Sequence, residues 1–91
     1  MRAQEAIDVA KKHVNELFAG EGAVNIGLEE LTFRDKEQVW EVTVGFSRAW
    51  DERFSQRITQ MAEPPPRTFK TILVRDRDAV VLGIRHWSEA A

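Results

Sequence analysis

The sequence predicts an α+β fold in which one N-terminal helix packs on a four-stranded antiparallel sheet. The first stretch has apolar residues at helical spacing, and four later stretches have apolar residues at alternate positions. Consecutive strands joined by short turns pair antiparallel. Since one amphipathic helix can cover one face of such a sheet, the pattern predicts two layers, with the order helix, strand, strand, strand, strand.

The helix is predicted over residues 3–19, because apolar residues recur there every three or four positions. They are Ala3, Ala6, Ile7, Ala10, Val14, Leu17 and Phe18. Charged residues such as Asp8 and Lys12 fall on the opposite face, as in an amphipathic helix. Gly20 follows the last periodic residue, and we expect it to take the left-handed conformation that ends a helix.

The strands are predicted over residues 23–34, 38–50, 67–76 and 79–87. The first changes phase between Leu28 and Leu31, which predicts a β-bulge near Glu29–Glu30. The charged tripeptide Asp76–Asp78 predicts a tight turn between the last two strands. The residues predicted to face inward are Ile7, Ala10, Val14, Leu17, Trp40, Val42, Val44, Phe46, Leu82 and Ile84.

The insertion of residues 51–66 separates the second strand from the third and allows three interpretations. Trp50 keeps the phase of the second strand, and residues 52–62 have the spacing of a short second helix ended by three prolines. Its apolar residues can close the core, form an exposed strip for a partner, or lie in a loop. The candidate interaction residues are Trp50, Arg53, Phe54, Arg57, Ile58 and Met61. Trp87 can join the same surface or pack under the helix.

Length and composition bound the class of protein. The 91 residues suit a single domain, 1–91, and the 43% hydrophobic and 31% charged content is that of an ordered globular chain. There is no cysteine to make disulfides or thiolate metal sites. The net charge of −2 argues against a nucleic-acid binder. Without a signal peptide or a long apolar segment, we expect a cytoplasmic protein with no membrane contact.

The residue types that carry chemistry do not form a convergent set. His13 lies beside the apolar helix stripe and His86 near the end of the last strand, without carboxylates at ligand spacing. The serines lack the glycines of a nucleophile elbow. Paired acids such as Glu29–Glu30 and Asp51–Glu52 typically mark bulges and helix starts. We therefore expect no enzyme activity, no cofactor and no metal site.

The whole-chain pattern resembles the PepSY and cystatin-like small domains, in which a sheet curls around a helix. The features that match are AIDVAKKHV on the helix, VWEVTV with Trp40 as a central strand, and TFKTILVRDRDAVVLGI with Asp76–Asp78 as the closing hairpin. Ala79 departs from the glycine that such domains place after the acidic turn. The resemblance implies a binding or inhibitory module rather than an enzyme.

We therefore expect a non-catalytic, regulatory or inhibitory module that contacts a protein partner, or a second copy of itself, through residues 50–66 or a sheet edge. Four open strands leave two edges whose unpaired backbone groups invite pairing. The alternative is a small ligand-binding or enzymatic domain that uses the concave sheet face as a pocket. A pocket needs polar groups facing inward, and the inward set offers almost none.

Replacing Phe54 and Ile58 together with serine is expected to leave the fold intact and to abolish partner binding or self-association. Circular dichroism measures the fold, and light scattering after size exclusion measures the association. Unfolding of the double variant would instead assign both side chains to the core.

Overall fold

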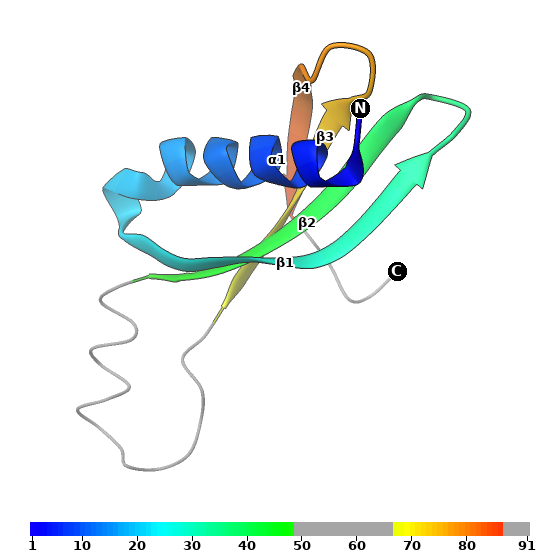
Figure 1. Cartoon of the computed structure of the whole chain (residues 1–91). Helices are drawn as coiled ribbons and strands as arrows, with labels where there is room; N and C mark the ends of the chain where they lie inside the picture. Colours follow the sequence, from blue (N-terminus) through cyan, green and yellow to red (C-terminus); the bar gives the residue numbers. More distant parts are fainter. Residues whose placement is uncertain (49–66, 87–91) are drawn as a thin grey trace, which may run out of the picture.

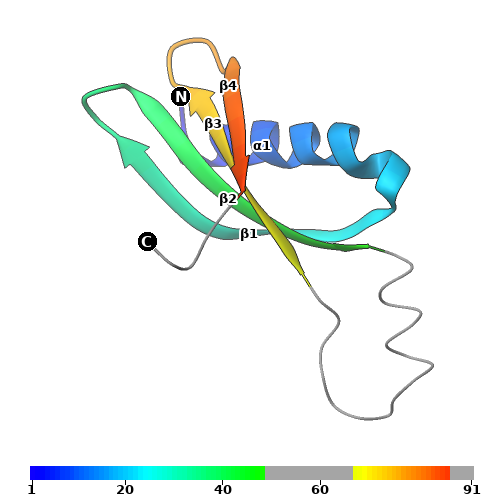
Figure 2. The same cartoon turned by 180° about the vertical axis from the view of Figure 1, so that it is seen from behind.

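A computed structural model describes residues 1–48 and 67–86 of the chain. Within these ranges the chain forms the helix α1 (Ala3–Phe18), the short 3-10 turn η1 (Ala19–Glu21) and the strands β1 (Ala23–Arg34), β2 (Val39–Arg48), β3 (Thr68–Arg75) and β4 (Val81–His86). The strands form one sheet in the order β1-β2-β3-β4, with each neighbouring pair antiparallel. The helix lies on one face of this sheet (Figures 1 and 2), which confirms the predicted α+β class.

The observed elements begin and end close to the predicted positions. Each strand lies within its predicted range to within a few residues, and the β-bulge predicted near Glu29–Glu30 is confirmed by a register shift between Leu28 and Glu30. The prediction of a left-handed residue at Gly20 is wrong. Gly22 takes that conformation instead (φ 71°) and donates its N–H to the Ala19 carbonyl, because η1 extends the helix by one tighter turn. The predicted second helix lies outside the described residues.

The core lies between α1 and the two central strands. Small helix residues allow close approach: Ala6, Ala10 and Val14 are fully buried. The sheet supplies alternate residues of two strands, namely Val42, Val44 and Phe46 of β2 and Ile72 and Val74 of β3. This alternation follows from the two-residue period of a strand, which turns the intervening residues to the other face. Phe18 in the last helical turn packs on Phe46, with ring centroids 5.0 Å apart.

Three residues predicted to face inward are instead largely exposed: Leu17 by 50%, Leu82 by 47% and Ile84 by 37%. Leu17 is exposed because the next residue, Phe18, is the one that packs on Phe46. For Leu82, the register shifts where Val74 pairs with Val81 and Leu73 pairs with Gly83, so Leu82 is an extra residue without its own partner. Val81 packs against the core in place of Leu82.

Ile84 is exposed for a different reason. It pairs with Ile72, which is buried under the helix, so its side chain lies on the helix side of the sheet. The main contacts of α1, however, are with β1, β2 and β3. The helix therefore leaves the helix side of β4 largely uncovered.

Among the described residues, no helix combines the length and the apolar character needed to cross a membrane.

The turn between β3 and β4 places a non-glycine residue in the left-handed region. Ala79 has φ 60°, donates its N–H to the Arg75 carbonyl at 2.9 Å, and packs its methyl group against the core. The backbone at Ala79 thus has a conformation that glycine adopts without strain.

We expect Ala79→Val to lower the free energy of unfolding by about 2 kcal/mol, because a β-branched residue strongly disfavours positive φ. The matched control Ala79→Gly should leave stability unchanged or higher, since glycine adopts this conformation readily. Urea denaturation of both variants provides the comparison. Equal stability of the valine and glycine variants would contradict this account of the turn.

Candidate functional site: the β4 edge and its attachment to the sheet

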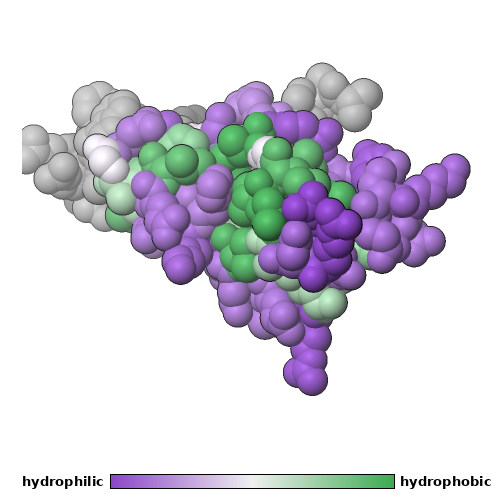
Figure 3. All heavy atoms as spheres, turned by 90° about the horizontal axis from the view of Figure 1, so that it is seen from above, coloured by the Kyte–Doolittle hydropathy of each residue, from purple (hydrophilic) through white to green (hydrophobic). Residues whose placement is uncertain are grey.

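Strand β4 and the residue that precedes it, Val80, present the main exposed apolar surface of the described sheet. Val80, Leu82 and Ile84 are exposed by 43%, 47% and 37%. Seen from above in Figure 3, apolar side chains gather in the middle of the visible surface, with hydrophilic side chains around them. Because β4 is the last strand in the sheet order, its outer side has no strand partner among the described residues. An edge strand with exposed apolar residues is typical of a protein-interaction site.

The face of the sheet opposite the helix, here called the outer face, is defined by Glu41, Thr43, Thr71 and Arg85. Arg85 pairs with Thr71 on β3, and Thr71 pairs with Thr43 on β2. These residues alternate with the core residues Val42 and Ile72, so they point away from α1. This face therefore connects β4 to the rest of the sheet independently of the helix.

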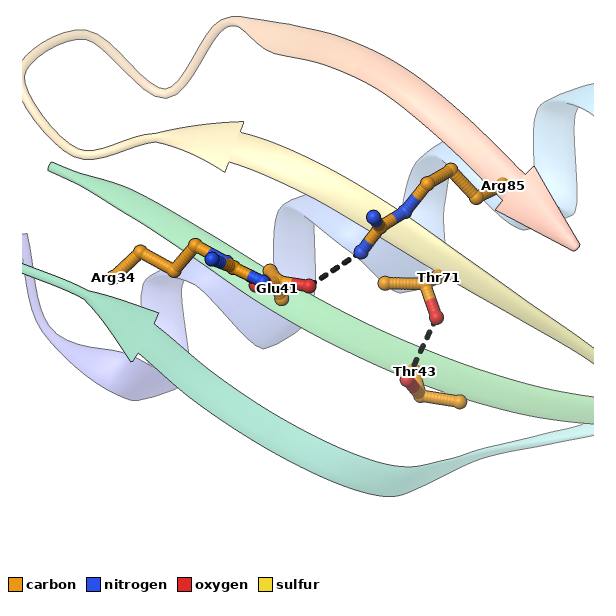
Figure 4. Close-up of polar contacts among 5 residues, drawn as sticks. All are labelled: Arg34, Glu41, Thr43, Thr71 and Arg85. Atoms are coloured by element: carbon orange, nitrogen blue, oxygen red, sulfur yellow. Dashed lines mark hydrogen bonds and ion pairs between the residues drawn. The ribbon is translucent and has the colours of Figure 1, made fainter. Parts of the chain in front are cut away.

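Glu41 on β2 is held between two arginines from different strands. Arg34 Nε, at the end of β1, donates to Glu41 Oε1, and Arg85 Nη2 donates to Glu41 Oε2. Figure 4 shows the Arg85 side chain extending from β4 across β3 to reach this carboxylate. The group spans the sheet from one edge strand to the other, so it helps to hold β4 in register.

The two arginines lower the pKa of the Glu41 carboxyl below its ordinary value. The hydrogen bond from Arg34 is the largest cause, and the hydrogen bond and charge of Arg85 add to it, while burial opposes the shift. The Glu41 side chain is only 13% exposed, whereas those of Arg34 and Arg85 are 56% and 54% exposed. Water reaches both arginines, so the ion pairs are partly screened.

Beside this group, the hydroxyls of Thr43 and Thr71 form a hydrogen bond of 2.9 Å between β2 and β3 (Figure 4). Both threonines are buried, with exposures of 4% and 6%. A buried hydroxyl is costly without a partner, and here each satisfies the other. Arg85 of β4 pairs with Thr71, so this hydrogen bond lies next to the Arg85–Glu41 ion pair on the same face.

The turn end of the β3–β4 hairpin is tied to the helix side of β2. Trp40 Nε1 donates to Asp76 Oδ1 at 2.9 Å, and the Asp76 N–H donates to the Gln38 carbonyl at 3.0 Å. The indole hydrogen bond, followed by the chain's amino group, lowers the pKa of Asp76. The structure thus joins Trp40 of β2 to Asp76 at the turn that follows β3.

Within the turn itself, Asp78 accepts two hydrogen bonds of 2.9 Å from Arg75, at Nε and Nη2, and a third from the Val80 N–H at 3.3 Å. The Arg75 hydrogen bonds are the main cause of a lowered pKa at Asp78. The paired geometry matches the planar guanidinium to the carboxylate. These bonds fix the direction in which β4 leaves the turn.

The opposite edge strand, β1, is irregular. Its register shifts twice, between Val24 and Gly27 and between Leu28 and Glu30, and Asn25 has φ 56°. Glu29 lies over Gly45 of β2, where a Cβ atom would meet the Glu29 carboxylate at 2.9 Å and the Phe69 ring at 3.0 Å. Such bulges and charges are the features that protect a sheet edge from further pairing. The two edges of the sheet therefore differ in character.

The interaction residues predicted from the sequence lie between Trp50 and Met61, outside the described residues. Trp87 also lies outside them. The exposed residues of β4 were missed because Leu82 and Ile84 were assigned to the core by their phase. A signal was present: Val80, Val81 and Leu82 are three consecutive apolar residues, and a regular strand cannot turn all three to one face.

Within residues 1–48 and 67–86, no group of three or more histidine or carboxylate side chains is placed to hold a metal ion. Comparison of the chain with protein-family models, with curated proteins and with solved structures found no match. Among the described residues, the exposed β4 edge is the feature that bears most directly on function.

Glu41→Gln is expected to lower the free energy of unfolding at neutral pH by about 1 kcal/mol, because the amide cannot replace the partly screened ion pairs. The pKa of Glu41 is lower in the folded chain than in the unfolded chain. The ion-pair contribution is therefore complete above the ordinary glutamate pKa of about 4.3 and is lost as the pH falls through the lower folded value.

Urea denaturation at neutral and at acidic pH measures this difference. The variant should lose less stability on acidification than the unsubstituted protein. Glu16→Gln, on the exposed face of α1, is the control and should have little effect at either pH. Identical behaviour of the two variants would contradict a stabilising role for the Arg34–Glu41–Arg85 group.

Proposed function

We propose that this protein is a non-catalytic protein-interaction module that contacts a partner chain through the exposed edge of β4. The observation that carries the proposal is the exposure of Leu82 and Ile84 on β4, and of Val80 just before it, at an edge that the helix does not cover. Adding a strand to such an edge satisfies its outward backbone groups and buries its apolar side chains.

The attachment of β4 supports this role. The hydrogen bonds of Asp78 and the contact of Arg85 with Glu41 hold the hairpin in an extended conformation before any partner arrives. A strand that is already ordered loses less conformational entropy on binding than a flexible segment. The resemblance to PepSY and cystatin-like domains supports the same class of function, a regulatory or inhibitory contact.

The alternative, a pocket between helix and sheet, has less support. The face under α1 is filled by side chains with 0% exposure, among them Ala10, Val44, Phe46 and Ile72. Their apolar character provides no polar groups with which to orient a small ligand. The packing on this face is therefore that of a core, which favours an interaction at the edge.

Ile84→Lys should abolish capture of the partner protein, since it places a charge at the centre of the edge. Affinity capture from the native host, followed by mass spectrometry, compares this variant with the unsubstituted chain. Leu28→Lys is the matched control, because Leu28 is a similarly exposed apolar residue (40%) on the irregular edge β1. It should retain the captured partner.

Circular dichroism establishes that both lysine variants are folded before capture. A partner that is retained by the folded Ile84→Lys variant and lost by Leu28→Lys would overturn the assignment of the interaction to β4. The same conclusion would follow if both variants retained every partner of the unsubstituted chain.

A further inference from the structure

The two sheet edges are not equally able to accept another strand. Edge β1 has two register shifts and the acidic pair Glu29–Glu30. Residues Gly83–His86 of β4, in contrast, pair with β3 in regular register after the shift at Leu82. This run contains no proline and only one strongly charged residue, Arg85. It is therefore the part of the described sheet best suited to extension.

We infer that the occupant of this edge is a second copy of the chain, joined by antiparallel pairing of β4 with β4 so that Ile84 lies opposite Ile84 of the second copy. This inference rests on the proposed function, because it names the partner that the β4 edge binds. The two sheets would then form one continuous sheet with both helices on the same side.

Symmetry restricts the ways in which two identical strands can pair. Antiparallel neighbours are related by a two-fold axis perpendicular to the sheet, which returns each face to itself, so the axis passes between two copies of the same residue. In the regular run of β4, the central candidates are Gly83, Ile84 and Arg85. Each choice makes a different set of cross-strand contacts.

An axis at Arg85 would place two guanidinium side chains directly opposite each other, which is unfavourable. An axis at Gly83 would set Ile84 opposite Leu82 of the second copy, where the register shift interrupts the alternation of faces. An axis at Ile84 avoids the arginine pair and moves the register shift outward, to the position where Leu82 lies opposite His86 of the second copy. It pairs apolar side chains that are both on the helix side of the sheet.

The neighbouring positions are also compatible with this register. Arg85 would lie opposite Gly83 of the second copy, on the outer face. The space above Gly83 is open, since the nearest atom to a Cβ placed there is Leu73 Cδ1 at 3.9 Å. Gly83 therefore presents no side chain to obstruct Arg85 of the other copy, whose own side chain extends the opposite way, across β3, to Glu41 of its own chain (Figure 4).

The chain provides a direct test because it contains no cysteine, so a single introduced thiol reports on one position. Ile84→Cys should form a disulfide-linked dimer about tenfold faster than Leu28→Cys on the β1 edge, because pairing holds the two thiols at high effective concentration. Both variants are oxidised under the same conditions and analysed without reductant. Equal rates would overturn the inference, since they would indicate random collision.

Light scattering after size exclusion supplies a second measurement, made without oxidation. The mass of the unsubstituted chain should rise from 10.5 kDa towards twice that value with increasing concentration. Ile84→Lys should weaken this association by about tenfold or more, because it sets two like charges opposite each other.

A constant mass of 10.5 kDa up to high micromolar concentration would overturn the dimer. So would a dimer in which Ile84→Cys does not cross-link. Either result would leave the proposed function intact, provided that affinity capture identifies a different partner protein. The folded Ile84→Lys variant should then no longer capture that protein. Loss of the proposed function would instead appear as capture that does not depend on Ile84.

Discussion

The width of one helix is the constraint on which the rest of this structure depends. An α-helix with its side chains is about 10 Å across, whereas neighbouring strands lie about 4.8 Å apart, so one helix cannot cover four strands. Here α1 is placed over β2 and contacts the strands on both sides of it, β1 and β3. The core therefore ends at Ile72 and Val74 of β3, and Ile84 on the next strand is exposed.

Because the helix does not cover β4, other contacts must hold that strand in place. The backbone pairing with β3 is one, and the hydrogen bonds of Asp78 in the turn are another. The third is on the outer face, where Arg85 reaches across β3 to Glu41. The outer face thus contributes to the order of the edge, although it contributes little to the apolar core.

The sequence predicted the parts of the fold that depend on periodicity. The alternation of Val42, Val44 and Phe46 requires a half-buried strand, and the phase change before Leu31 requires the bulge that the structure contains. Periodicity assigns a residue to a face, but it does not show whether anything covers that face. Ile84 is on the predicted helix side and is exposed all the same, because coverage depends on where the single helix lies.

The candidate site was less predictable for a related reason. The contact between Arg85 and Glu41 joins strands that are not neighbours, so no local spacing in the sequence indicates it. The register shift at Leu82 likewise depends on how the hairpin closes, with Ala79 in the left-handed region. The run Val80–Leu82 indicated that alternation fails there, but it did not distinguish burial on both faces from exposure.

The difference between the two edges helps to explain the amino-acid composition of β4. Exposed apolar side chains on a regular edge strand promote unwanted association unless the edge is protected, and β1 has such protection in its bulges and acidic residues. The regular run Gly83–His86 of β4 has little of this protection.

A chain of this length also buries only about 60–65% of its unfolded surface, so its core leaves a narrow margin of stability. Covering β4 with another strand would bury Ile84 and satisfy its outward backbone groups at the same time. The same narrow helix that leaves β4 outside the core thus creates the surface at which association would add most to stability.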